Sequence, residues 1–561
     1  MRIKQAKTPV PVLQSTLDQL MDKFIKKTRE IFLAKQGGIF SSALILSAMI
    51  IISSAFGFLR YRILATYFTT GDLDIFFAAF RIPDLVFELL ITGALTSSFI
   101  PIYIKYQNNA KELEENVSSI FNLLCIALSI FVFVLYFSLD FLIPALTPGF
   151  KGEKLRLIIL YSKILLVGQL PFLVIGNFLT GIAQAKKIFL VSALSPIVYN
   201  ISVIVATFLL SSSFGLAAPI WGVDVGAVLF LAVQIPILTH GNINYKPIIK
   251  ITEGVREFFT MIGPRILTVL ISQIDATIDL SLTSLLGTGA YTIFYFAQHL
   301  QLLPISIVGV AFGQASLPYL SELFEQKKMD EFKKLIIDSL LNLLYITIPI
   351  TVYFIFARTP MVRIFFGGER FDWNATVQTA FTLSYFALSM PFHTVYYFLT
   401  RSFYALLDSK TPFLISLITI AINTSLSLLF VLVFHFPVWA LAISFSISVV
   451  INTSALFILL HKKIGGLDIH FFAEEIAKAI FCAIIAAPPS YYFIKLFDNL
   501  ILDTTRTINV FFLLGISVLI YFLLYLFLSW LMSVKALYSL VSLIAKLKQF
   551  KKNITEMPHY E

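Results

Sequence analysis

Charged side chains are scarce in this chain of 561 residues: Asp, Glu, Lys and Arg make up 13%, whereas 58% of the residues are hydrophobic. Soluble domains carry about 25% charged residues, so the composition excludes an ordinary soluble protein and predicts an integral membrane protein. The only two cysteines, Cys125 and Cys482, each lie inside an apolar run, so neither a disulfide nor a cysteine metal site is expected. The first long apolar run begins near Ile39, and we therefore expect no cleavable signal peptide.

The signatures of several enzyme classes are also missing. The sequence has no Gly-x-x-x-x-Gly-Lys-Ser/Thr phosphate loop, no His-Glu-x-x-His and no Cys-x-x-Cys, and its seven histidines are scattered. We therefore expect no catalytic residues, no metal site and no bound cofactor. The net charge of +10 comes from basic residues in short polar segments between apolar runs, which indicates contact with an anionic membrane face and no nucleic-acid partner.

The long apolar runs predict an all-α integral membrane fold of about fourteen transmembrane helices. The expected spans are residues 39–68, 74–103, 117–145, 155–184, 188–211, 216–240, 256–286, 290–320, 335–357, 374–405, 411–434, 437–461, 471–495 and 508–532. The distribution of basic residues among the short loops predicts that both termini are cytoplasmic. Residues 1–38 are predicted to be a basic cytoplasmic segment, which is either an amphipathic helix on the membrane surface or a solvated tail.

Short matches between the two halves of the chain indicate an internal repeat. Pro171-Phe172 recurs as Pro391-Phe392, and Asn122-Leu123-Leu124 recurs as Asn342-Leu343-Leu344, both at an offset of 220. Because the offset spans six helices, an even number, the two repeats are parallel. The expected domains are the segment 1–38, an N-lobe at 39–240, a C-lobe at 241–465, two further helices at 466–535 and a basic cytoplasmic tail at 536–561.

Charged residues at membrane depth are the candidate functional residues. Asp74, Arg81, Asp84 and Glu88 on the second span fall within a sector of about 80° of a helix. The seventh span repeats this spacing with Arg265, Ser272, Asp275 and Asp279. Two interpretations remain open: the residues pair inside a packed bundle, or both stripes line one hydrated cavity.

Three further features of the spans favour the cavity interpretation. Arg60 and Arg62 lie late in the first span and follow Gly57, which could let that helix bend. Pro83 and Pro304, each in the second helix of its half, predict local breaks, and such breaks are tolerated where the backbone faces protein or water.

Four segments carry a resemblance to a known family. They are Gly57-Phe58-Leu59-Arg60 with the run from Asp74 to Asp84, Pro264-Arg265 with Gln273, the run from Pro304 to Pro318, and the run from Phe403 to Pro412. Together they resemble the MurJ (MviN) family of lipid II flippases, within the superfamily of multidrug, oligosaccharidyl-lipid and polysaccharide exporters. The resemblance implies two six-helix lobes plus two C-terminal helices, and alternating access driven by a Na⁺ or H⁺ gradient or by membrane potential. It also implies a central cavity whose cationic residues bind the pyrophosphate of an undecaprenyl-linked peptidoglycan precursor.

The resemblance assigns roles only where residues match. Arg60 and Asp74 match two cavity charges of the family, whereas Ser54, Phe87, Glu88 and His299 stand where the family has arginines. The expected cavity residues are Arg60, Arg62, Asp74, Arg81, Asp84, Glu88, Arg265 and His299. A family cation site, formed by an acid on helix 7 and an Asn on helix 11, corresponds to Asp279 and Asn423, with Asp275 as a further candidate.

The sequence leaves three functions open. The first is a flippase of the bacterial inner membrane that moves lipid II from the cytoplasmic to the outer leaflet, with membrane lipids around it and cell-wall synthesis proteins as conceivable partners. The second is a related exporter of another lipid-linked oligosaccharide or of an amphipathic cation, which the acidic residues on spans 2 and 7 favour. The third is a membrane scaffold for envelope synthesis that transports nothing, and the charge stripes count against it.

Overall fold

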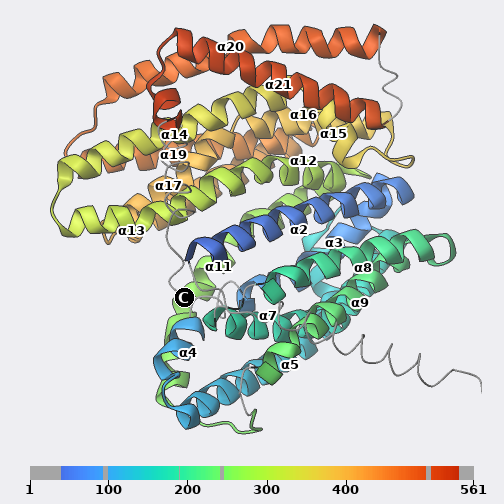
Figure 1. Ribbon diagram of the computed structural model, residues 1–561. Helices are drawn as coiled ribbons and strands as arrows, with labels where there is room; N and C mark the ends of the chain where they lie inside the picture. The colour runs from blue at the N-terminus through green and yellow to red at the C-terminus, as the bar shows by residue number, and fades with distance from the viewer. Residues whose placement is uncertain are drawn as a thin grey trace, which may run out of the picture. The chain divides into compact units, whose positions relative to one another are not determined.

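A computed structural model of the chain describes residues 39–91, 99–186, 188, 190–240, 245–500 and 507–541 (Figure 1). Within these ranges every regular element is helical and none is a strand. The predicted cytoplasmic segment 1–38 and most of the predicted C-terminal tail lie outside the described residues.

The chain divides into two compact units, each built from more than one stretch of sequence. Unit 1 comprises Met1–Leu64, Ala79–Ile143 and Arg156–Gln273, and unit 2 comprises Ala65–Ala78, Pro144–Leu155 and Ile274–Glu561. Two helices, α3 (Thr70–Leu90) and α11 (Glu253–Leu285), contribute residues to both units. The lobe boundaries expected from the sequence stay a prediction.

The remaining helices lie wholly or mostly in one unit. Unit 1 holds α2 (Ile39–Tyr67), α4 (Ile100–Tyr106), α5 (Ala110–Leu146), α6 (Gly152–Gly168), α7 (Leu170–Ala185), α8 (Leu190–Phe214), α9 (Ala217–Gln234) and α10 (Pro236–His240). Unit 2 holds α12 (Ala290–Pro304), the π-helix η2 (Ile305–Val310), α13 (Ala311–Glu325), α14 (Met329–Phe356), α15 (Arg358–Phe366), α16 (Trp373–Ala387), α17 (Met390–Ala405), α18 (Lys410–Leu428), the π-helix η3 (Leu429–Val433), α19 (Trp439–Lys463), α20 (Ile469–Leu500) and α21 (Thr507–Leu531).

The all-helical membrane fold expected from the sequence is confirmed. Each predicted span coincides with helix in the described residues, because in lipid a backbone must satisfy its own hydrogen bonds. Nine helical segments of the described residues are long and apolar enough to cross a membrane. The other five predicted spans, at 39–68, 74–103, 256–286, 374–405 and 471–495, stay predictions as membrane crossings.

The helix boundaries agree with the internal repeat. Helices α7 and α17 are each 16 residues long, begin 220 residues apart and carry a proline in the first turn. Each follows a break in a longer helical segment, at Gln169 in unit 1 and at Ser389 in unit 2. Helices α8 and α18 also begin 220 residues apart, at Leu190 and Lys410.

Small residues allow α8 and α9 to pack closely in unit 1. Gly222 and Gly226 lie four residues apart on one face of α9, a spacing that lets membrane helices approach. A Cβ atom on Gly222 would lie 2.6 Å from the Cβ of Ala206 and 3.0 Å from the Cα of Val203. The Ser202 hydroxyl on α8 donates to the Gly222 carbonyl at 2.9 Å, which adds an interhelical hydrogen bond at this contact.

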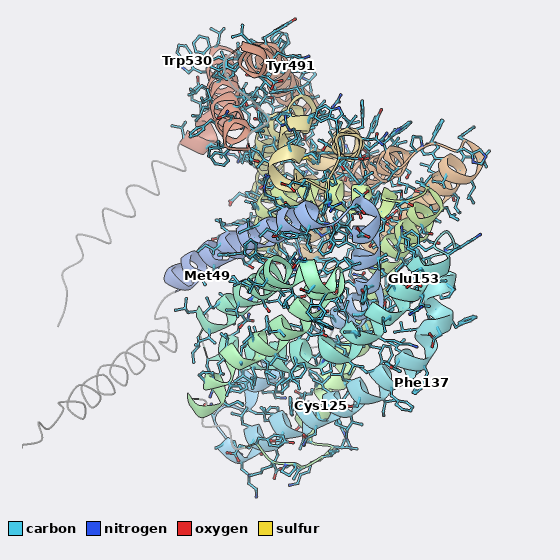
Figure 2. The ribbon with its side chains drawn as sticks, turned by 90° about the vertical axis from the view of Figure 1, so that its right-hand side faces the viewer. Met49, Cys125, Phe137, Glu153, Tyr491 and Trp530 are labelled. Carbon is cyan, nitrogen blue, oxygen red and sulfur yellow. The ribbon has the colours of Figure 1, made fainter. Side chains whose placement is uncertain are left out.

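In unit 2, α20 and α21 lie side by side and pack against α14 and α15 (Figure 1). Their outer surface is aromatic: Tyr491 and Trp530 project away from the pair, and Trp530 is 59% exposed (Figure 2). In unit 1, Phe137 projects from α5 in the same way and is 65% exposed (Figure 2). Such surfaces are typical of helices that face lipid.

The turn between α17 and α18 of unit 2 lies outside the predicted spans and belongs to the run from Phe403 to Pro412, which carries part of the family resemblance. Asp408 accepts hydrogen bonds from the backbone N–H and the hydroxyl of Thr411 at 3.0 and 2.7 Å, and it pairs with Lys463. Burial raises the pKa of the Asp408 carboxyl, but the bonds from Lys463 and Thr411 outweigh burial and lower it to about 2. The carboxylate therefore stays charged and fixes the start of α18.

We predict that Gly222→Ala lowers the melting temperature of the purified protein, because the added methyl must displace the backbone of α8. The expected cost is about 1–3 kcal/mol, as for other overpacked sites. Gly515→Ala is the matched control, because a Cβ at Gly515 on α21 meets no atom within 4 Å. Thermal unfolding followed by intrinsic fluorescence compares the two, and equal melting temperatures would contradict the close packing of α8 on α9.

Candidate functional site

In unit 2, the carboxylate of Asp74 is fully buried near the start of α3 and is surrounded by donors. Lys154 forms an ion pair with it at 2.7 Å between Nζ and Oδ2. The backbone N–H groups of Gly289 and Thr292 donate to it at 2.6 and 2.8 Å, and the Thr292 hydroxyl donates at 2.9 Å. Each carboxylate oxygen is thus satisfied, which a buried charge requires.

The loop between α11 and α12 is shaped to hold Asp74. Gly289 caps α12 with φ of +87°, a left-handed conformation that favours glycine. In this conformation its N–H points at the carboxylate, and a side chain would collide with Thr70, whose Cβ would be 2.9 Å away. The N-terminus of α12 also favours a negative charge. The structure therefore places Asp74, a predicted cavity residue, in an ion-paired anchor to the start of α12.

Stacked aromatic rings connect α3 to His299 on α12, which is another predicted cavity residue. Phe77 on α3 stacks on Tyr295 with ring centroids 4.2 Å apart. Tyr295 in turn packs on His299 at 3.9 Å, and the His299 Nδ1 atom contacts the Tyr295 carbonyl oxygen at 2.8 Å. His299 is half-buried and held by its own helix.

In unit 1, Arg81 joins α3 to α11. Its side chain is 9% exposed, and both terminal nitrogens donate to Gln273, to Oε1 at 3.0 Å and to the backbone carbonyl at 2.7 Å. Two parallel bonds from one guanidinium fix both groups. The Arg81 contact is of the kind expected if the charged residues pair inside a packed bundle.

The next turns of α3 are more accessible. Asp84 is exposed and interacts electrostatically with Arg81, Glu88 and Arg60. Glu88 is half-buried, as is Arg60, whose guanidinium carbon lies 4.8 Å from the centre of the Tyr61 ring. The structure thus brings together Arg60, Arg81, Asp84 and Glu88 within unit 1, as a cluster of mixed charge.

The remaining predicted residues of the first two spans and of the eighth are placed as follows. Arg62 is half-buried on α2, which continues as helix through Gly57. Helix α3 likewise continues through Pro83 to Leu90, whereas α12 ends at Pro304 and passes into the π-helix η2. The side chains of Arg265 and Ser272 lie outside the described residues. The hinge roles of Gly57, Pro83 and Pro304 stay predictions.

A second acidic site lies in unit 2 between α11 and α18. The carboxyl of Asp275 is within hydrogen-bonding reach of the Asn423 amide, and Asn423 is 3% exposed. The Oδ1 atoms of both residues are buried and have no hydrogen-bond partner among the described residues. Asp279, one turn farther along α11, is also buried. Asp275 is therefore the acid for which the structure describes a contact with Asn423.

The surroundings of Asn423 are rich in oxygen. On the same face of α18, one turn away on each side, lie the buried hydroxyls of Thr419 and Ser427. Ser427 contacts Ser444 of α19 at 2.6 Å between the hydroxyl oxygens, and Thr419 accepts from Asn452 at 2.9 Å. Carboxylate, amide and hydroxyl oxygens are the donors that hard cations prefer.

Two residues of these sites were not singled out from the sequence as site residues. Lys154 lies outside the predicted spans, and its pairing with Asp74 across 80 positions has no local sequence signal. The Thr292 hydroxyl donates to Asp74 from the start of α12, a contact that only the folded structure reveals. A further residue, Asp224 on α9 of unit 1, was also not singled out, although an acid inside the apolar run at 217–238 is a signal in the sequence.

Comparison with known proteins gives consistent results along most of the chain. The family described as "Lipid II flippase MurJ" matches residues 64–512. A "Probable lipid II flippase MurJ" of Rickettsia prowazekii (strain Madrid E) is 29% identical over 406 residues, covering 70% of this chain and 78% of the relative. The "Lipid II flippase MurJ" of Burkholderia cenocepacia is 25% identical over 445 residues, covering 76% and 84%.

Solved structures agree at the level of the fold. A structure described as "Lipid II flippase MurJ, inward closed conformation" superimposes with a TM-score of 0.72 at 24% identity, covering 87% of this chain and 98% of that chain. An inward-facing MATE family transporter of the MOP superfamily superimposes with a TM-score of 0.63 at 13% identity, covering 76% and 98%. The chain therefore shares the helical fold of these two structures.

We predict that Lys154→Met destabilises the protein, because it leaves the buried Asp74 carboxylate without its cation. Breaking a buried pair from one side costs about 3–5 kcal/mol, and the remaining donors to Asp74 place this case at the lower end. The melting temperature should partly recover in Asp74→Asn/Lys154→Met, in which no charge is left unpaired. Lys151→Met, at an exposed lysine three residues away, is the control. If Lys154→Met and Lys151→Met have the same melting temperature, the ion pair between Lys154 and Asp74 does not stabilise the protein.

Proposed function

Because this chain belongs to the lipid II flippase MurJ family, we propose that it moves lipid II from the cytoplasmic to the outer leaflet of a bacterial inner membrane. The observation that carries the proposal is the family match along residues 64–512, which includes Asp74, Arg81, Asp275 and Asn423 and begins four residues after Arg60. The two relatives, of which this chain covers 78% and 84%, are named "Probable lipid II flippase MurJ" and "Lipid II flippase MurJ". Transport, rather than catalysis, is the activity of this family.

The membrane placement follows from the same family. The chain is a multi-pass membrane protein, and we place both termini in the cytoplasm on the distribution of basic residues. The apolar polyprenyl tail of the substrate can stay in lipid, so that only the head group needs a polar path. Alternating access would expose that path to one side at a time, with membrane lipids around it and enzymes of cell-wall synthesis as partners on either side.

Arg60 is the residue proposed to hold the substrate pyrophosphate. A pyrophosphate inside the membrane needs donors, and a guanidinium provides two parallel ones. Arg60 is half-buried against Tyr61 and interacts electrostatically with Asp84. An anion that enters this cluster would compete with Asp84 for Arg60, so substrate binding and release would exchange one ionic partner for another.

Asp275 and Asn423 are proposed to bind the coupling cation, and we propose Na⁺. The two buried oxygen atoms without donors fit a cation, as does the hydroxyl-rich face of α18 and α19 around them. An amide oxygen cannot take up a proton near neutral pH, but it can coordinate a metal ion. These residues would hold the ion, and its binding in one conformation only would couple transport to its gradient.

We predict that Arg60→Ala abolishes lipid II flipping in proteoliposomes while the amount of folded protein stays close to normal. Arg60→Lys should also reduce flipping, because an ammonium group cannot form the two-pronged contact with a pyrophosphate. The measurement is transport per folded molecule, with the exposed Arg156→Ala as the control. Normal flipping by folded Arg60→Ala would remove Arg60 from the substrate site.

We predict that Na⁺, compared with choline at equal ionic strength and pH, raises the melting temperature of the wild-type protein. A ligand that binds the folded state stabilises it by about 2.7 kcal/mol at a hundredfold excess over Kd. Asp275→Asn and Asn423→Ala should lose this shift, whereas Asp330→Asn, at an exposed acid on α14, should keep it. A melting temperature that changes with pH but not with Na⁺ would identify the coupling ion as a proton instead.

A further inference from the structure

Unit 1 contains an acid that the proposed function does not use. Asp224 lies on α9, eight residues into the apolar segment Ala217–Leu238. The residue is half-buried, but its Oδ1 atom is fully buried and has no hydrogen-bond partner among the described residues. An ionised carboxylate in such a place is costly, since nothing replaces the water it loses.

The carboxyl group lies against the point where the helical segment of α6 and α7 breaks. A Cβ atom on Gly168, the last residue of α6, would lie 2.5 Å from the Asp224 Cγ atom and 2.7 Å from Oδ1. Any residue other than glycine at this position would therefore displace the carboxyl group. The glycine at the end of α6 thus leaves the space that the Asp224 carboxyl group occupies.

The residue that follows Gly168 adds a second unsatisfied oxygen. Gln169 is 5% exposed, and its Oε1 atom has no hydrogen-bond partner among the described residues. Its amide nitrogen is directed at the Tyr199 hydroxyl of α8, 3.4 Å away. Tyr199 also interacts electrostatically with Asp224. Two buried acceptor oxygens, one on Asp224 and one on Gln169 at the break, thus lack a donor among the described residues.

The equivalent place in unit 2 serves as an internal comparison. The repeat offset of 220 relates Gln169 to Ser389 and Asp224 to Ser444. Ser389 contacts the Gln301 amide nitrogen at 2.7 Å, and Ser444 contacts Ser427 at 2.6 Å. Both serines are therefore satisfied. The break in unit 2 thus has a serine at the position that corresponds to Asp224, so an acid beside the break is no general requirement of the fold.

We propose that Asp224 is a proton-binding site of unit 1, which takes up a proton on its carboxylate and releases it again. Protonation forms one O–H bond, removes the buried charge and turns an acceptor into a donor. This is the change that a site of unsatisfied acceptors requires. No other ligand has to enter.

A proton fits this site better than a metal ion. Carbon atoms of Gly168 cover the carboxyl group on one side, and the described oxygen donors beside it are few, unlike those around Asn423. The titratable groups that face the site are Tyr199 on α8 and, through Tyr199, Arg60 on α2 and Asp84 on α3. On α6, Lys163 is paired with Asp140 at 2.6 Å.

Proton binding here would be linked to the charge cluster of unit 1. Tyr199 interacts electrostatically with Arg60, Asp84 and Asp224, so it connects the acid to the arginine proposed to bind substrate. Linkage is reciprocal: an anion on Arg60 and a proton on Asp224 would each alter the affinity for the other. This link rests on the proposed function, whereas the proton site does not.

Infrared difference spectroscopy of the purified protein in nanodiscs, between mildly acidic and mildly alkaline pH, tests the proposal directly. The wild-type protein should show the carbonyl stretch of a protonated carboxyl group that disappears as the pH rises. Asp224→Asn should lack this component, and Asp140→Asn, at an exposed acid of unit 1, should keep it. Gly168→Ala should shift the midpoint pH of the component, because the methyl group displaces the carboxyl.

Each outcome decides the proton-site proposal without a transport assay. Failure of this proposal is therefore distinguishable from failure of the proposed flippase function. Identical spectra of the wild type and of folded Asp224→Asn would overturn it. Loss of the component on addition of Na⁺ at constant pH would also overturn it, because the ligand would then be a metal ion. If Asp224→Asn does not fold, an unchanged midpoint in folded Gly168→Ala would contradict the site.

Discussion

Backbone hydrogen bonding in lipid is the constraint on which this structure depends. Every peptide group inside the bilayer needs a partner, so the spans are helical and each interruption must be compensated. Interruptions in the described residues include those at Gln169, Pro304 and Ser389, and polar side chains gather at Gln169 and Ser389. A position that weakens a helix can therefore also be a position where polar chemistry is tolerated, as it is for Asp224 beside Gly168.

Buried polar groups meet this constraint in two ways. Some have partners: Asp74 has a lysine and three donors, and Ser389 has Gln301. Around Asn423 and in unit 1, several acceptor atoms lack donors among the described residues. Fully satisfied groups fix a structure, whereas open acceptors leave room for a ligand whose arrival changes the charge of the site. Anchors and candidate ligand sites are thus distinguished by their hydrogen bonds.

Sequence reasoning predicted the fold well and the site only in part. Long apolar runs and a repeat offset of 220 were sufficient for the helical segments, because both signals are local or periodic. The charge stripe on span 2 was identified, yet its members divide between two units: Asp74 is anchored to α12, and Arg81 to Gln273. Partners such as Lys154 lie far away in sequence, so periodicity could not reveal them. Asp224 needed the structure to show its contact with Gly168.

The shared break before α7 and α17 also bears on the history of the chain. Two helices of equal length that begin 220 residues apart, each with a proline in the first turn, are the expected product of an ancient gene duplication. Duplicated halves start with identical chemistry, and afterwards each copy mutates independently. The backbone interruption has been retained in both copies, while the side chains beside it have diverged into glutamine with aspartate in one and two serines in the other. Duplication thus freed one copy to acquire an ionisable group at a position where the other keeps a neutral one.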